Sequence, residues 1–144
     1  MENVPQRPAP QIVEPGPSPG MVTLTHVLYA MHGFSALMGI MGTAFIVTAF
    51  LTGWPSIIAV IINYVKRGDA RGTWLDSHYG WQIRTFWWAV LWVIIAGLMF
   101  IVLAITIVGL LIPWAFLALV GLWVLYRIIR GWMALAQRRP MPLS

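Results

Sequence analysis

Four apolar stretches, separated by short polar or turn-forming segments, make up most of the chain. The first covers about residues 24–52. As a helix rising ~1.5 Å per residue, it would cross a hydrocarbon core of ~30 Å. The stretches at about 74–104 and 110–136 are also long enough for this. We therefore predict long membrane-spanning helices over these three ranges.

The remaining apolar stretch, about residues 54–66, is short. We expect the first helix to end at Gly53-Trp54-Pro55, because proline is acceptable as the opening residue of a new helix. A helix over 54–66 would reach only ~20 Å, so it could be a short span, a re-entrant half-helix or an extension of a kinked first helix. A short span is favoured, because Lys66 and Arg67 can extend its reach to the headgroups and it leaves the preceding turn uncharged. The fold expected is an all-α integral membrane protein with four transmembrane helices, the second one short.

The two ends of the chain differ from this apolar domain. Six prolines lie within the first 20 residues, where few side chains could be buried. Such a segment cannot offset the entropy of ordering. We expect a disordered Pro-rich tail over residues 1–22, in preference to a docking motif for a proline-binding partner. The transmembrane domain should cover residues 23–137, and residues 138–144 should form a C-terminal tail.

Composition supports a membrane environment. The 144 residues are 60% apolar and 9% charged, with a mean hydropathy of +0.81 and nine tryptophans. These values are typical of integral membrane proteins, in which Trp gathers at the lipid–water interfaces. The lipid bilayer is therefore the expected partner. The net charge of +5 does not indicate a nucleic-acid-binding protein, because every base except Arg7 flanks an apolar stretch.

The basic residues also predict an orientation. Eight of the nine lie in the 66–84 connector and the C-terminal exit, while the other two turns carry no charge. Positive residues are retained on the cytoplasmic side, so we expect the connector and the C-terminus there. With four spans the N-terminus is cytoplasmic too. A three-span arrangement would differ only in placing the N-terminal tail outside.

A row of small residues indicates a packing face on the first helix. Ser35, Gly39 and Thr43 recur every four residues and therefore share one side of the helix. Small side chains allow close approach of a neighbouring helix in a membrane. Packing within one molecule is favoured over a seam between two copies.

Candidate binding residues concentrate in the connector. Thr73 and Asp76 have the spacing of a capping box that opens the third helix. The helix then places one stripe on a single face: Trp74, His78, Trp81, Thr85, Trp88 and Trp92. An interfacial aromatic belt is favoured for it, and the alternative is a binding platform with His78 as its polar group. Arg84 should contact a lipid phosphate or a helix-end carbonyl, and Asp76 either the cap or a nearby base.

The sequence predicts no catalytic centre, metal site or cofactor. His26 and His32 are six residues apart and so do not share a helix face as a ligand pair. The chain has no cysteine, and we find no phosphate-binding glycine loop and no Ser/His/Asp set. We therefore expect a protein that is not an enzyme.

Part of the pattern resembles a known family. A helix end over Ile61–Arg67 runs from apolar to basic, and a short loop leads to Trp74-Leu-Asp-x-His78 and a third helix. This arrangement resembles small bacterial inner-membrane proteins grouped as a domain of unknown function and related to the four-helix component of the chloroplast inner-envelope translocon. The resemblance covers about residues 23–135, with Thr73 where many members have Pro and Ser77 where an acid is usual. It implies four spans, a short second helix, the bacterial inner membrane and no assigned catalytic residue.

These observations favour an accessory or scaffolding component of a membrane complex, acting with a protein partner or as a homo-oligomer. The alternative is a small transporter or channel-forming subunit that works as an oligomer. A transporter needs hydrophilic groups at mid-bilayer, where the sequence offers Thr43, Thr48, Asn63 and small hydroxyls.

Overall fold

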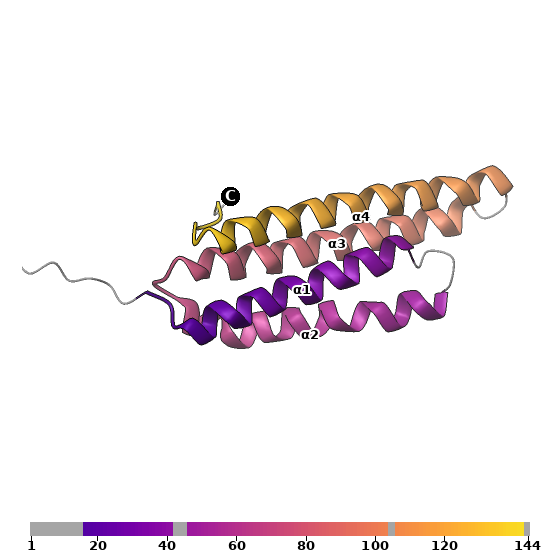
Figure 1. The fold of residues 1–144 in the computed structure, drawn as a ribbon. Coiled ribbons are helices and arrows are strands. Elements are labelled where there is room, and N and C mark those ends of the chain that lie inside the picture. Colours follow the sequence, from indigo (N-terminus) through magenta and orange to yellow (C-terminus); the bar gives the residue numbers. More distant parts are fainter. Residues whose placement is uncertain (1–15, 42–45, 104–105, 143–144) are drawn as a thin grey trace, which may run out of the picture.

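Four helices form an antiparallel bundle in the computed structural model, which describes residues 16–41, 46–103 and 106–142. They are α1 (Pro19–Met41), α2 (Ile46–Ala70), α3 (Leu75–Leu103) and α4 (Ile107–Ala136). Helix α1 packs against α2 and α4, and α3 packs against the same two helices. The C-terminus, the start of α1 and the α2–α3 connection lie at one end of the bundle (Figure 1). The all-α class predicted from the sequence is confirmed.

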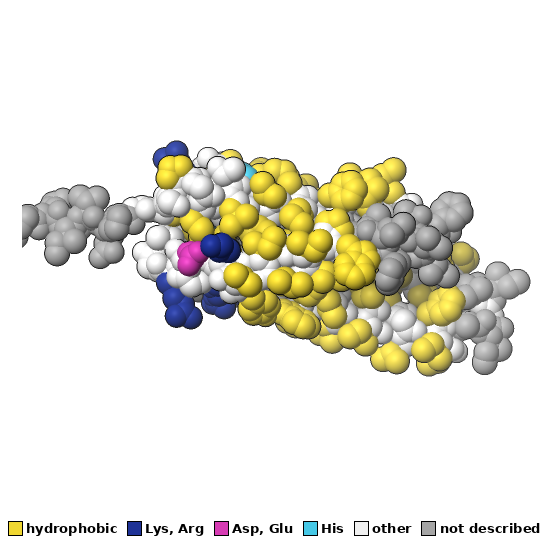
Figure 2. Space-filling model, turned by 90° about the horizontal axis from the view of Figure 1, so that it is seen from below, with side chains coloured by type: hydrophobic (Ala, Val, Ile, Leu, Met, Phe, Trp, Pro, Cys, Tyr) yellow, Lys and Arg dark blue, Asp and Glu magenta, His cyan; other side chains and the backbone are white. Residues whose placement is uncertain are grey.

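Three of these helices could cross a membrane. Among the described residues, Pro19–Met41, Leu75–Leu103 and Leu111–Ala136 are long and apolar enough to do so. Many of their large apolar side chains are exposed, among them Leu98 and Ile101 of α3 and Leu119 of α4. Hydrophobic side chains cover most of the described surface in Figure 2, and the charged ones gather near one end. The chain is therefore a membrane protein with at least three candidate spans.

The division between α1 and α2 differs from the prediction. The break does not fall at Gly53-Trp54-Pro55: α1 already ends at Met41, and α2 runs through these residues with Pro55 inside it. The prediction of a short second helix is therefore wrong, since α2 has 25 residues. Proline removes one helical N–H, but a neighbouring helix can supply hydrogen bonds beside it. Here the Ser56 N–H donates to Ser35 Oγ of α1 at 3.1 Å.

The starts of α3 and α4 agree more closely with the sequence. Thr73 Oγ1 accepts a hydrogen bond from the Leu75 N–H at 3.3 Å, which is the predicted cap. The Thr73 N–H donates to the Ala70 carbonyl, so the reciprocal half of the capping box is not made by the Asp76 carboxylate. Thr106 caps α4 by accepting from the Gly109 N–H at 3.0 Å. The last helix thus begins a few residues before the predicted position 110.

The predicted row of small residues is confirmed only in part. Ser35 contacts α2 through the Ser56 N–H, and Thr43 lies outside the described residues. Gly39 is exposed, and a Cβ added to it would meet no atom within 4 Å. The described close approaches instead involve two glycines of α4. An added Cβ would lie 2.6 Å from Ile40 Cγ1 at Gly121 and 2.5 Å from the Tyr29 hydroxyl at Gly131.

Candidate functional site

The polar end of the bundle, formed by residues 66–85 and 127–142, contains the candidate site. Its inner face belongs to the first three turns of α3, where eight residues are buried: Leu75, Ser77, His78, Tyr79, Trp81, Gln82, Ile83 and Thr85. Helix α3 is buried far more here than in its later turns, where most side chains are exposed. The polar groups of this segment must therefore find partners within the protein.

His78 is fully buried and joins three parts of the chain. Its Nδ1 atom lies 3.0 Å from the Tyr29 hydroxyl of α1, and its Nε2 atom lies 2.8 Å from the Arg139 carbonyl oxygen. The carbonyl only accepts, so Nε2 carries the proton and Nδ1 accepts from the tyrosine hydroxyl. Both ring nitrogens are thus engaged inside the molecule. The role of His78 in binding a ligand stays a prediction. Its observed hydrogen bonds join α3 to α1 and to the C-terminal segment.

The C-terminal segment folds back over α3. Arg138 has a φ of 51°, and the Arg138 and Arg139 N–H groups donate to the Leu135 and Ala134 carbonyls. These two bonds form a Schellman motif, which reverses the chain after a helix. The Met141 N–H then donates to Ser77 Oγ at 2.8 Å. This return places the Arg139 carbonyl against His78.

Arg84 also holds this segment. Its Nη2 atom donates to the Pro142 carbonyl at 3.0 Å. The prediction offered a lipid phosphate or a helix-end carbonyl as its partner. The partner here is a carbonyl, and it belongs to the C-terminal segment beyond the end of α4.

Trp81 and Thr85 bind one arginine of α4. The Arg127 guanidinium carbon lies 3.8 Å from the centroid of the Trp81 ring, and its Nε atom donates to Thr85 Oγ1 at 2.9 Å. The Trp81 indole N–H donates to the Arg127 carbonyl at 3.1 Å. A cation above an aromatic face gains more when it is withdrawn from water. Trp81 is only 5% exposed, so its contact with the Arg127 guanidinium is largely shielded from water.

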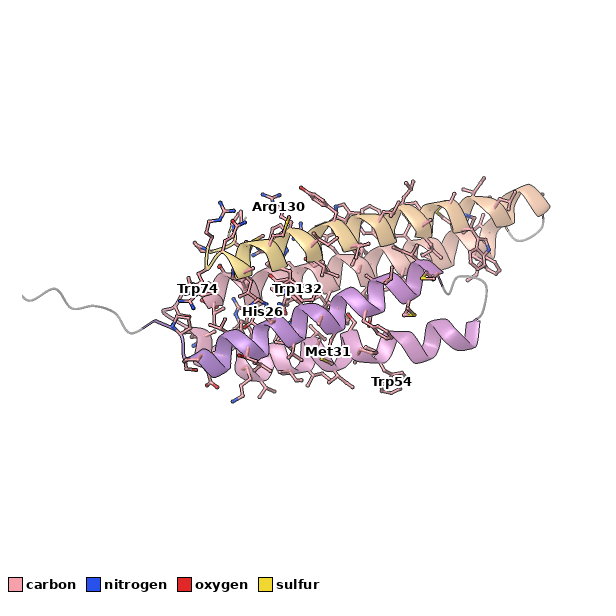
Figure 3. The ribbon with its side chains drawn as sticks, in the orientation of Figure 1. His26, Met31, Trp54, Trp74, Arg130 and Trp132 are labelled. Atoms are coloured by element: carbon pink, nitrogen blue, oxygen red, sulfur yellow. The ribbon has the colours of Figure 1, made fainter. Side chains whose placement is uncertain are left out.

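The residues of the predicted stripe differ in exposure along α3. Trp74 is half-buried, with its ring centroid 5.5 Å from that of His78. Trp88 lies outside the buried segment, is 48% exposed and stacks on Trp92 at 6.4 Å. A further indole, that of Trp132 on α4, joins α4 to α1 at the polar end. It donates to His26 Nδ1 at 2.9 Å (Figure 3). The indoles thus serve internal packing at one end and the apolar surface farther along.

Asp76 makes an ion pair at the surface. Its Oδ1 atom lies 3.5 Å from Arg67 Nε of α2, with both side chains more than one-third exposed. One of the bases named beforehand is therefore its partner. A single pair of this exposure contributes little, about 0–1 kcal/mol. Asp76 and His78 do not hydrogen-bond to each other in the described contacts.

Polar groups beneath this layer were not recognised as site residues from the sequence. Asn63 of α2 donates to Gln82 Oε1 at 2.9 Å, and both residues are buried. His32 Nδ1 lies 2.5 Å from Ser56 Oγ, beside the proline of α2. Within the described part of the chain, His32 Nε2, Asn63 Oδ1 and Gln82 Nε2 have no hydrogen-bond partner. Their signal in the sequence is a polar side chain within an apolar helix, which marks a functional candidate in a membrane.

The site does not identify a reaction. Within residues 16–41, 46–103 and 106–142, no three His, Cys, Asp or Glu side chains are grouped to hold a metal ion. No protein-family model, curated protein or solved structure matches the chain. At the polar end, hydrogen bonds hold the helices and the C-terminal segment together, and exposed basic side chains surround them.

Proposed function

We propose that the chain is a four-span inner-membrane protein that serves as an accessory or scaffolding component of a membrane complex. The observation that carries this proposal is the distribution of polar groups along the bundle interior. A central cavity lies between the helices, and its described polar lining on α1 and α2 includes His32, Ser35 and Ser56. On α3 the polar lining ends at Thr85, and Phe86, Ala89 and Val93 follow it. A transport path would need hydrophilic groups through this half as well.

The polar half itself is suited to a fixed structure. Trp81 and Thr85 both hydrogen-bond to Arg127 of α4, and His78 hydrogen-bonds to Arg139 in the segment that follows α4. Breaking one of these buried bonds leaves an unsatisfied group, so the interior resists the rearrangement that alternating access requires. The exposed cations at this end, among them Lys66 and Arg71, offer a surface to a cytoplasmic partner.

The fourth span in this proposal is α2. Its 25 residues extend ~37 Å, more than the thickness of a hydrocarbon core, and its charged residues lie in the last turns. The end of α2, which carries its charged residues, lies at the same end of the bundle as the C-terminus (Figure 1). The positive-inside rule then puts this end in the cytoplasm. The family resemblance of the connector is in keeping with such a four-span protein.

Cysteine labelling tests the orientation, since the natural chain has no cysteine. Asp69→Cys places a thiol at the polar end. Met41→Cys places one at the other end, because Met41 is the last residue of α1 and is 69% exposed. In intact cells an impermeant maleimide should label Met41→Cys and leave Asp69→Cys unlabelled until the cells are opened. The reverse pattern would overturn the proposed orientation.

Affinity purification tests the scaffolding role. We expect the tagged chain, cross-linked in the membrane and purified in mild detergent, to retain one membrane protein in fixed proportion. Gly39→Leu and Gly97→Leu form a matched pair, because both glycines are exposed with free space around an added Cβ. Loss of the partner with only one variant would locate the contact face. Recovery of the chain alone, together with solute flux in proteoliposomes, would favour the transporter instead.

A further inference from the structure

A cavity of about 430 Å³ lies between the four helices, next to the polar end. Its walls come from every helix, including Tyr29 and His32 of α1, Ser56 of α2, Gln82 of α3 and Val124 of α4. Small residues create the space, because Ala36, Gly53 and Ala89 stand where larger side chains would fill it. Ligand-binding cavities in proteins have volumes of roughly 300–1,000 Å³. The space is therefore of ligand size.

Two of the lining side chains present unused polar atoms. His32 is 5% exposed and Gln82 is 3% exposed, and among the described residues neither His32 Nε2 nor Gln82 Nε2 has a hydrogen-bond partner. The Gln82 amide oxygen is already engaged by Asn63, so the free amide group is an N–H donor. Leaving a buried polar atom without a hydrogen bond is unfavourable. A ligand that hydrogen-bonds to both groups would remove this cost.

The imidazole can serve a ligand as donor or as acceptor. When the Ser56 hydroxyl donates to His32 Nδ1, Nε2 carries the proton and donates. When Nδ1 donates to the hydroxyl, Nε2 accepts. A ring carbonyl would fit the first state, and a ring hydroxyl would fit the second.

The remaining walls define the rest of the ligand. The lining residues that the structure describes include no Lys, Arg, Asp or Glu, so a charged headgroup would lose its hydration without a counter-charge. Tyr29, Trp81 and Phe86 provide aromatic surface near the polar atoms, which suits a flat ring. Most of the lining is apolar, and an apolar wall does not hold water well. The ligand is thus neutral, flat and lipid-soluble.

We propose that this cavity binds the ring of a quinone-type lipid, with a carbonyl or hydroxyl oxygen between His32 and Gln82. The apolar tail would lie in the part of the cavity that is lined by Val93 and Leu117. Ring, oxygens and tail then match the aromatic, polar and apolar walls. The site does not depend on the proposed scaffolding role, because it uses interior groups only.

The test uses the full chain in nanodiscs of phosphatidylcholine. The probe is a benzoquinone with a decyl tail, and its control is decylbenzene, which has the same tail on a flat six-membered ring without oxygen. We expect saturable quenching of tryptophan fluorescence by the quinone, since Trp81 lines the cavity. Decylbenzene should not displace it. A photoreactive quinone should cross-link to peptides that contain Trp81 or Ala89.

Two pairs of variants locate the site. Ala89→Phe fills the cavity, and Ala115→Phe adds the same volume on the exposed face of α4. His32→Phe removes the free nitrogen, and His26→Phe changes the other α1 histidine, which is not among the lining residues. We expect the first member of each pair to weaken binding at least tenfold and the second to leave it unchanged.

Several results would overturn the proposal. Wild-type protein that shows no saturable quinone binding would do so, and so would decylbenzene that competes equally. Cross-links confined to other peptides would place the ligand elsewhere. These measurements use the wild-type chain, so they decide the matter even if Ala89→Phe or His32→Phe does not fold.

Discussion

Gly131 of α4 should be the least replaceable glycine of the polar end. A Cβ added there would lie 2.5 Å from the Tyr29 hydroxyl oxygen, 2.7 Å from Cε1 and 2.8 Å from Cζ. Tyr29 is fully buried, and its hydroxyl donates to His78. Tyr29 also lines the central cavity, so the ring can withdraw from an added Cβ, and we expect that movement to break its bond to His78. Gly131→Ala should therefore push Tyr29 away and leave His78 Nδ1 without a donor.

The magnitude follows from three effects. Overpacking a filled site costs about 1–3 kcal/mol. Loss of the Tyr29–His78 bond in a buried place costs about 1–3 kcal/mol more. Replacing glycine by alanine within a helix returns ~1 kcal/mol. We therefore expect Gly131→Ala to lower the free energy of unfolding by about 1–5 kcal/mol.

Unfolding of the purified protein in mixed micelles, titrated with sodium dodecyl sulfate and followed by tryptophan fluorescence, measures this loss. Gly97→Ala is the matched control, because Gly97 is exposed on α3 and an added Cβ there meets no atom within 4 Å. It should be neutral or stabilising by up to ~1 kcal/mol. A wild-type unfolding midpoint for Gly131→Ala would refute the contact.

A double mutant tests the mechanism. Tyr29→Phe removes the oxygen that lies nearest the added Cβ, and it also removes the donor to His78. Gly131→Ala should then cost less in the Tyr29→Phe background than in the wild type, because part of the loss has already occurred. Equal costs in the two backgrounds would show that the glycine acts without Tyr29.

Three further variants follow from the polar end. His78→Ala should destabilise by about 2–5 kcal/mol, because it leaves a cavity and two unpaired partners. Asp76→Asn should change stability by no more than ~1 kcal/mol, because its pair with Arg67 is exposed. Truncation after Arg138 should also destabilise, because it removes the Arg139 carbonyl, the Met141 N–H and the Pro142 carbonyl together with the buried Met141 side chain.

The same micelle titration measures all three variants. His78→Gln is the control for His78→Ala, since it keeps volume and polar atoms. A silent His78→Ala would show that the two hydrogen bonds contribute nothing. A large effect of Asp76→Asn would mean that the carboxylate does more than pair with its arginine. A silent truncation would show that the C-terminal segment contributes nothing.

The positions of the apolar helices could be predicted from sequence because hydropathy is a local property. Helices α3 and α4 begin within a few residues of the expected starts, 74 and 110. Thr73 was identified as a cap for the same reason, since its partner is the Leu75 N–H two residues on. The all-α class and the membrane environment likewise depend on composition and on the length of each apolar stretch.

The boundary between α1 and α2 required the tertiary structure. Glycine and proline at 53–55 are strong local signals for a break, yet α2 continues through them. Ser35, twenty-one residues earlier in the chain, accepts the N–H that follows the proline. A neighbouring helix can thus satisfy a backbone group that its own helix does not, and no local pattern reveals that neighbour.

The partners of the candidate site were also decided by the fold. Helical spacing correctly put Trp74, His78 and Trp81 near one another, but it could not show that His78 is buried between Tyr29 and Arg139, 49 and 61 residues away. Those contacts require α1 to lie beside α3 and the chain to turn back after α4. Side-chain direction follows from the helix itself, whereas the group that a side chain meets depends on which distant segments pack there.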